Sequence, residues 1–153
     1  MRLKVVLPSL VVIVLVIVIS LMVLSSAMES LSGFHRTTFQ TSSGPFVLDG
    51  LDAEKCVSVV YQRDNSTLSG YVVIFQNQSA AQRFMSNYIS QINESNVTEI
   101  QLLGNIVKLY TFPNGGYTIV SVRGNAFIVA ASYRVDLSTL KEFYDLLVNR
   151  YVS

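Results

Sequence analysis

The stretch "IVKLYTFPNGGYTIVSVRGNAFIVAASY", residues 106–133, decides the fold. It holds three runs rich in valine, isoleucine and tyrosine, which are typical of β-strands. The runs are separated by Pro113–Gly116 and by Gly124-Asn125, and glycine and asparagine tolerate the positive φ angles of tight hairpin turns. A similar run precedes them across Gly104-Asn105. We therefore predict an antiparallel meander with strands at Glu99–Leu103, Ile106–Phe112, Tyr117–Val122 and Phe127–Tyr133.

A helix is predicted directly after the meander. Apolar side chains recur there at intervals of three and four residues, namely Leu137, Leu140, Tyr144, Leu147, Val148 and Tyr151. Asp136 stands where a good N-cap belongs. In the strand before this helix, Phe127–Tyr133, both alternating faces are apolar, so we place that strand at the centre of the sheet.

A second hairpin and helix lie on the N-terminal side of the meander. "KCVSVVYQ" (55–62) and "SGYVVIFQ" (69–76) read as two strands joined by the loop "RDNSTL". The next segment, "SAAQRFMSNYISQI" (79–92), changes to a helical period of three and four. Ser79 followed by Gln82 fits a capping box at the start of this helix.

The fold class that follows is α+β, in the order ββαββββα. Consecutive antiparallel strands with two amphipathic helices predict a two-layer domain of about six strands. We expect both helices to pack on one face of the twisted sheet. The other face is then solvated, covered by a partner, or covered by the stalk segment that precedes residue 46.

Residues 5–24, "VVLPSLVVIVLVIVISLMVL", contain no charged residue. Twenty helical residues span about 30 Å, the thickness of the hydrocarbon core of a bilayer. Arg2 and Lys4 precede the run, which predicts a cytoplasmic N-terminus and an extracytoplasmic C-terminal domain. Small residues at Ser25–Ala27 would also suit signal peptidase, but the run exceeds the apolar core of a signal peptide. We predict a retained single-pass signal anchor in the cell membrane, in contact with lipid through residues 5–24.

The domain organisation follows from this anchor. Residues 1–4 form a short cytoplasmic tail, 5–24 the transmembrane anchor, 25–45 an extracytoplasmic stalk, and 46–153 the folded domain. The stalk is assigned from its serine, threonine and glycine content. Within it, "HRTTFQ" (35–40) is able to pair as a short edge strand.

Catalytic and metal-binding groups are scarce in this sequence. His35 is the one histidine and Cys56 the one cysteine of the chain, and a stalk histidine is a poor base for a distant thiol. Asp49, Asp52 and Glu54 read as a solvated loop without the glycine and final acid of an EF-hand. We therefore predict no enzyme activity, no catalytic residues, no metal site and no cofactor.

Four N-glycosylation acceptor patterns lie in the extracytoplasmic part. They begin at Asn65, Asn77, Asn93 and Asn96. Glycosylation occurs on translocated surface loops, which agrees with the predicted topology. The alternative is that asparagine and serine populate turns for conformational reasons.

Charge and composition narrow the partners. Without Arg2 and Lys4, the 11 basic residues fall to nine, against 10 acidic residues. No basic stripe for a nucleic acid is present. The hypothesis is a non-enzymatic, membrane-anchored extracytoplasmic domain, an accessory or interaction subunit of a cell-envelope assembly with a protein partner. A ligand-binding or sensor module is the alternative.

A filament subunit is a further alternative. An apolar N-terminal helix followed by an antiparallel sheet is similar in outline to a type IV pilin. Pilins carry a glycine processing site before the apolar run and a glutamate near its start. Here Lys4 is followed directly by Val5, and Glu29 is the first glutamate.

Overall fold

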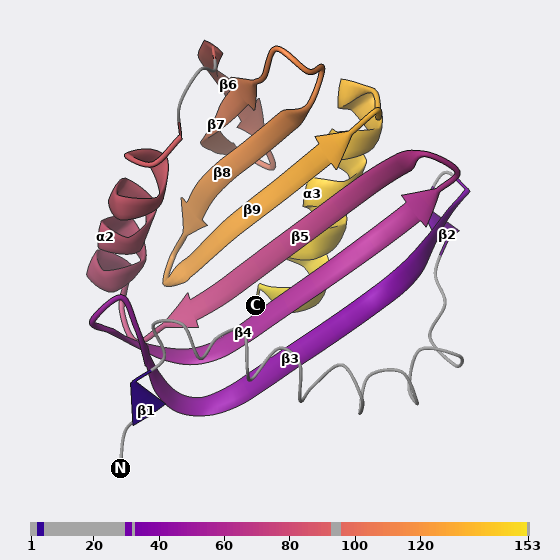
Figure 1. Cartoon of the computed structure of the whole chain (residues 1–153). Helices are drawn as coiled ribbons and strands as arrows, with labels where there is room; N and C mark the ends of the chain where they lie inside the picture. Colours follow the sequence, from indigo (N-terminus) through magenta and orange to yellow (C-terminus); the bar gives the residue numbers. More distant parts are fainter. Residues whose placement is uncertain (1–2, 5–29, 32, 93–95, 153) are drawn as a thin grey trace.

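The computed structural model describes residues 3–4, 30–31, 33–92 and 96–152. Within these ranges the chain forms one sheet and two helices (Figure 1), which confirms the predicted α+β class. The strands are β1 (Leu3–Lys4), β2 (Ser30–Leu31), β3 (Phe34–Leu48), β4 (Leu51–Arg63), β5 (Ser66–Phe75), β6 (Asn96–Leu102), β7 (Asn105–Thr111), β8 (Tyr117–Arg123) and β9 (Ala126–Tyr133). The helices are α2 (Gln78–Ile89) and α3 (Leu137–Tyr151).

The long strands lie in the order β3-β4-β5-β9-β8-β7-β6, and each neighbouring pair is antiparallel. The predicted meander is confirmed as β6 to β9, and the predicted hairpin as β4 and β5. Strands β5 and β9 lie side by side at the centre of the sheet (Figure 1). The central position predicted for the strand at Phe127–Tyr133 is therefore confirmed.

The two helices cover opposite faces of the sheet, so the prediction that both pack on one face is wrong. Phe127 and Val129 of β9 belong to the core beneath α2, whereas Ile128 and Ala130 belong to the core beneath α3. In Figure 1, α3 crosses behind β5 and β9. The physical reason is the composition of β9 itself. A strand that is apolar on both faces needs a cover on both, which makes the centre of the domain three layers thick.

Aromatic packing fixes α2 on its face. Phe84 is buried, and its ring centroid lies 5.2 Å from that of Phe75 and 4.9 Å from that of Phe127. Tyr88 adds a further edge contact with Phe127 at 5.4 Å. Apolar and aromatic burial of this kind is the main source of helix docking energy.

The face beneath α3 is packed closely at β5. A Cβ atom on Gly70 would lie 2.7 Å from Cδ2 of Leu147 and 2.9 Å from Cζ of Phe143. Deeper in the same core, the hydroxyl groups of Ser121 and Tyr144 share a buried hydrogen bond of 2.7 Å. Glycine at position 70 therefore sets how near α3 approaches the sheet.

The caps of the helices agree with the sequence at one helix and not at the other. Asp136 caps α3, as predicted, and accepts hydrogen bonds from N and Oγ1 of Thr139 at 3.2 and 2.7 Å. At α2 the predicted capping box is wrong, because Asn77 is the N-cap and its Oδ1 accepts from N of Ala80 at 2.8 Å. Ser79 already lies inside the helix. Asparagine is as good a cap as serine, and the helix begins two residues earlier than predicted.

The predicted stalk needs correction from residue 34 onward. Phe34–Leu48 forms β3, a full strand of the sheet that pairs with β4 from His35 to Leu48. The short edge strand considered for 35–40 is therefore confirmed and extended. Phe34 is fully buried, so one face of β3 contributes to the core. Five of its 15 residues are serine or threonine, and all five are exposed or half-buried because β3 is an outer strand with partly solvated side chains.

Neither α2 nor α3, the helices in the described part of the chain, is long and apolar enough to cross a membrane. The predicted anchor, 5–24, lies outside the described residues. Leu3 and Lys4 pair in parallel with Phe46 and Val47 of β3, whereas a cytoplasmic tail at 1–4 would hold them across the membrane. The two arrangements exclude each other.

Candidate functional site

Strand β6 forms one edge of the sheet. Within the described ranges it pairs with β7 and with no other strand. All of its residues are exposed or half-buried, it contains no proline, and Glu99 is its one charged residue. An edge strand of this kind presents a row of backbone N–H and C=O groups with which another strand can pair.

The β6–β7 turn determines which backbone groups of β6 point outward. Leu103 and Gly104 have φ angles of 51° and 75°, as in a two-residue type I′ turn. The flanking residues Leu102 and Asn105 are register partners and form the hydrogen-bonded pair that closes such a turn. Hydrogen-bonded and non-hydrogen-bonded pairs alternate along the ladder. The residues whose backbone groups point away from β7 are therefore Gln101, Glu99 and Val97.

Side-chain hydrogen bonds hold this turn in place. Arg123 on β8 donates from Nη1 and Nη2 to the carbonyl oxygen of Leu103, both at 3.3 Å. Asn105 donates from Nδ2 to the carbonyl oxygen of Val122 at 3.2 Å. The hydrogen bonds from Arg123 connect the end of β6 to β8, across β7. Arg123 therefore has a structural role at this turn.

Exposed apolar side chains gather near this edge. Val97 on β6 is 53% exposed, Ile106 on β7 is 61% exposed, and Leu103 in the turn between them is 45% exposed. Tyr110, opposite Val97, belongs to the core beneath α2. Val97 and Ile106 consequently share that face of the sheet, since residues an even number apart point the same way. We call β6 and these three side chains the β6 edge.

The opposite edge of the sheet is protected. Strand β3 carries two irregularities, between Arg36 and Thr38 and between Ser43 and Phe46, and Pro45 lies in the second of them. Bulges and prolines interrupt further pairing. The short strand β2 also pairs with β3 at Phe34 and His35 (Figure 1). The two edges differ, and β6 is the one open to strand addition.

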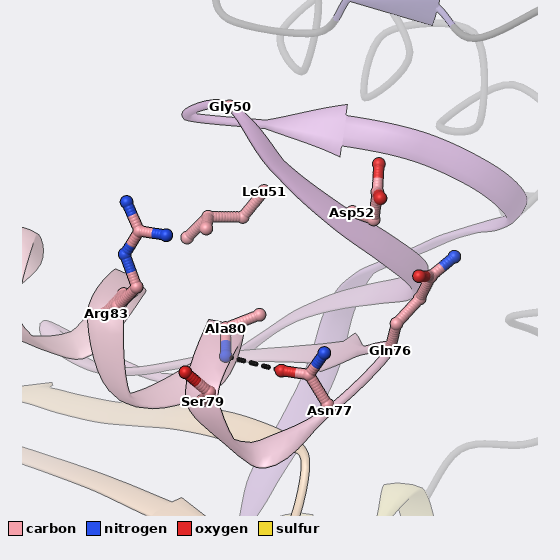
Figure 2. A pocket seen from close by; sticks show the side chains of 8 residues that line it. All are labelled: Gly50, Leu51, Asp52, Gln76, Asn77, Ser79, Ala80 and Arg83. Atoms are coloured by element: carbon pink, nitrogen blue, oxygen red, sulfur yellow. Dashed lines mark hydrogen bonds between the residues drawn. The ribbon is translucent and has the colours of Figure 1, made fainter.

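A small pocket lies between the β3–β4 turn and the first turn of α2 (Figure 2). Its volume is about 250 Å³, below the 300–1,000 Å³ usual for small-molecule sites. Figure 2 shows Arg83 on the helix side and Asp52 on β4 across from it. The hydrogen bond from Ala80 to Asn77 occupies one of the amide donors at the start of the helix. The pocket therefore offers little to an anion or an organic ligand.

The lone cysteine belongs to the sheet and is remote from the histidine. Cys56 is half-buried and lies opposite Ser42, whereas His35 lies opposite Gln62. Six residues of β4 separate these positions, a span of about 20 Å. Burial raises the pKa of Cys56 to about 11, and a hydrogen bond with Tyr71 lowers it only in part. A Cys–His catalytic pair is excluded by this placement.

This environment predicts a sluggish thiol. A pKa of about 11 instead of 9.0 leaves about 100-fold less thiolate at pH 8, and the thiolate is the reactive form. We expect iodoacetamide to modify Cys56 about 100-fold more slowly in the folded chain than in guanidinium chloride. The folded rate should rise about tenfold between pH 8 and 9. Equal rates in the folded and unfolded chains would contradict the assignment.

The carboxylates singled out in the sequence do not form a site. Asp49 lies in the β3–β4 turn with a φ angle of 52°, Asp52 is half-buried on β4, and Glu54 is exposed at a bulge. In the described part of the chain no group of three His, Cys, Asp or Glu side chains could hold a metal ion.

Arg134 makes a cation–π contact with its neighbour Tyr133, with its guanidinium carbon 5.3 Å from the ring centroid.

The four predicted sugar sites fall in different settings. Asn65 is exposed in the two-residue turn between β4 and β5, and Asn96 is exposed at the start of β6. Asn77 uses its side-chain oxygen as the cap of α2. Asn93 lies outside the described residues. Asn65 and Asn96 are therefore exposed, and within the described part of the chain neither side chain is hydrogen-bonded, whereas the Asn77 side chain is engaged at the start of α2.

No protein-family model, curated protein or solved structure matches the chain.

The structure brings together few of the residues that the sequence singled out. The β6 edge is the surface that sequence reasoning missed. The sequence pattern identified Glu99–Leu103 as one strand of the meander. This strand is followed by another strand but preceded by a helix, so it has a consecutive strand to pair with on one side only. That asymmetry was the available signal that it would end the sheet.

Proposed function

We propose that this chain is a membrane-anchored, extracytoplasmic, non-enzymatic domain that works by binding protein through the β6 edge. The open edge of β6 carries the proposal. Backbone groups of three residues point outward there, and exposed apolar side chains flank them. Addition of a strand to an exposed sheet edge is a common mode of protein recognition, in which the main chain supplies affinity and neighbouring side chains supply specificity.

The anchor in this proposal is residues 5–24. Sixteen of these residues are leucine, isoleucine or valine, and each contributes roughly 0.3–0.6 kcal/mol to insertion. Insertion therefore gains on the order of 5 kcal/mol or more. The β1–β3 pairing involves two residues and supplies about 1 kcal/mol per hydrogen bond. In the anchored chain the insertion energy prevails, and Leu3 and Lys4 leave β3 for the cytoplasmic side.

Because the proposal places the folded domain on the extracytoplasmic side of the membrane, we expect Asn65 to carry an N-linked sugar. Strands β9, β8 and β7 lie between β5 and β6 in the sheet, so a glycan on the β4–β5 turn leaves the β6 edge accessible. Asn77 is the weakest acceptor of the described three, because its side chain caps α2. Intact-mass measurement of the native protein shows whether sugar is attached to the polypeptide. A mass equal to that of the bare chain would rule the sugar out.

A ligand-binding role is less well supported. The pocket at α2 is small, and Arg83 and Asp52 place opposite charges on its rim. A filament role requires a processing site that the sequence lacks before Val5. A non-enzymatic role agrees with the distance between His35 on β3 and Cys56 on β4, because His35 lies opposite Gln62 and Cys56 lies opposite Ser42.

The test is gentle detergent extraction of the tagged full chain from its native membranes, followed by mass spectrometry. An untagged copy is co-expressed so that a second copy of the chain is also detected. The decisive variant is Glu99→Pro, because proline removes an outward N–H and is tolerated on edge strands. Glu99→Ala is the matched control, since it removes the same side chain and keeps that N–H. A stoichiometric partner retained by the control and lost by the proline variant supports the proposal. An unchanged set of proteins would overturn it.

A further inference from the structure

We infer that the occupant of the β6 edge is a second copy of this chain, paired antiparallel through β6 about a two-fold axis. This inference rests on the proposed function and names the partner at the same surface. It follows from the register that β6 allows with itself. Paired strands would join two sheets into one continuous sheet, a closed C2 arrangement in which the same patch is used twice.

The pleat limits the possible registers. Residues directly opposite each other in an antiparallel pair point to the same face. A two-fold axis perpendicular to the sheet puts the α2 face of one copy on the same side as the α2 face of the other. The axis must therefore pass at a residue of β6. With the axis at Glu99, each Glu99 carboxylate faces its copy, and like charges directly opposite are unfavourable. The neighbouring choices are Thr98 and Ile100.

The register centred on Ile100 matches the side chains best. It places Glu99 opposite Gln101 of the second copy, a pair whose backbone groups both point outward. On the face covered by α3, Ile100 meets Ile100 of the second copy. Ile100 and Leu102 are half-buried at the margin of the core beneath α3, so that the second copy extends this core beyond β6.

The exposed apolar side chains agree with the same register. Val97, 53% exposed, comes beside the β6–β7 turn of the second copy, where Leu103 is 45% exposed. This contact occurs twice, once at each end of the paired strands. The register centred on Thr98 instead places Val97 opposite the charged Glu99 and Ile100 opposite Asn96. Apolar pairing and the absence of opposed like charges therefore favour the Ile100 axis.

The geometry makes Ile100 a sensitive reporter. Its backbone groups point toward β7, so that across the new interface it occupies a non-hydrogen-bonded pair, in which Cα atoms are about 4.5 Å apart. A disulfide accommodates separations of about 4.4–6.8 Å. In a Cys56→Ser background, Ile100→Cys should form a disulfide-linked dimer under mild oxidation. Thr98→Cys and Ile106→Cys are the matched controls, because they lie close by and off the axis.

The experiment measures the mass of the full chain in detergent by light scattering, and the cross-linked fraction on non-reducing gels. We expect a polypeptide mass of two chains for wild type and Glu99→Ala, and of one chain for Glu99→Pro. Most of the Ile100→Cys protein should cross-link, with at least a fivefold smaller fraction for both controls. Circular dichroism checks that Glu99→Pro is folded, and the cysteine variants test the interface independently if it is not.

Each contrary result has a separate meaning. A single-chain mass at every protein concentration, or a dimer that resists Glu99→Pro while folded, overturns the second copy as occupant. Preferential cross-linking through Thr98→Cys overturns the register. If a different protein co-purifies and is lost with Glu99→Pro, the inference fails and the proposed function stands. If neither a second copy nor another protein depends on Glu99, both fail.

Discussion

Replacing Phe84 by alanine is expected to lower the free energy of unfolding by about 3–5 kcal/mol. The Phe84 ring is 7% exposed and packs between Phe75 and Phe127. Its removal leaves a cavity between α2 and the sheet that the two remaining rings cannot close. A domain of this size has about 5–15 kcal/mol of stability in total. The change therefore removes a large part of it, and α2 is the element that loosens first.

Urea unfolding followed by circular dichroism measures this loss, and the melting temperature should fall by roughly 10–20 °C. Arg83→Ala is the matched control, since it lies beside Phe84 on α2 with an exposed side chain and should change stability by less than about 0.5 kcal/mol. A loss below about 1 kcal/mol for Phe84→Ala would contradict the packing of α2 on this face.

The same variant tests the placement of the helices on opposite faces. Phe143 lies in the core beneath α3, on the far side of the sheet from Phe84. Stacked layers are about 10 Å apart, and distant substitutions add within about 0.5 kcal/mol. Phe84→Ala and Phe143→Ala should therefore be additive. Helices packed side by side on one face would give a clear coupling energy.

The sequence contained the information for this arrangement, although local patterns alone did not use it. In β9 both alternating faces are apolar, from Phe127 to Ala130, which indicates a strand covered on both sides. The two helices follow the two central strands, β5 and β9. Assigning both to one face left half of the apolar surface of β9 without a cover. The periodicity identified each element, but the choice of face depends on the whole sheet.

Composition misled the prediction where strands are solvated. The serine- and threonine-rich segment before Phe46 was assigned to a stalk, yet it forms most of β3 because an outer strand buries one face only partly. The same limit applies to the candidate site. The run at Glu99–Leu103 was recognised as a strand, but its position at the edge of the sheet is set by the order of all the strands. Local sequence does not encode that order directly.

Valine at position 70 is expected to destabilise the chain by about 3 kcal/mol or more, at the upper end of the usual cost of overpacking. Gly70 lies in β5 beneath α3, and a Cβ there would meet Cδ1 and Cδ2 of Leu147 at 2.8 and 2.7 Å. Real Cβ atoms do not approach that closely, so α3 must move away from the sheet or the Leu147 side chain must turn. Urea unfolding of the Gly70→Val variant measures the loss.

The control and the rescue follow from the pleat of β5. Ser69→Val adds the same side chain at the neighbouring residue, which points to the other face and is exposed, so its effect should stay within about 0.5 kcal/mol. Leu147→Ala alone should cost about 2–5 kcal/mol. Combined with Gly70→Val it makes room for the new methyl groups, and the two losses should fall short of additivity by about 1–3 kcal/mol. Strict additivity would mean that Leu147 does not press on Gly70. The distance of α3 from the sheet would then be set by another contact, and glycine would be needed at position 70 for a reason other than this close approach.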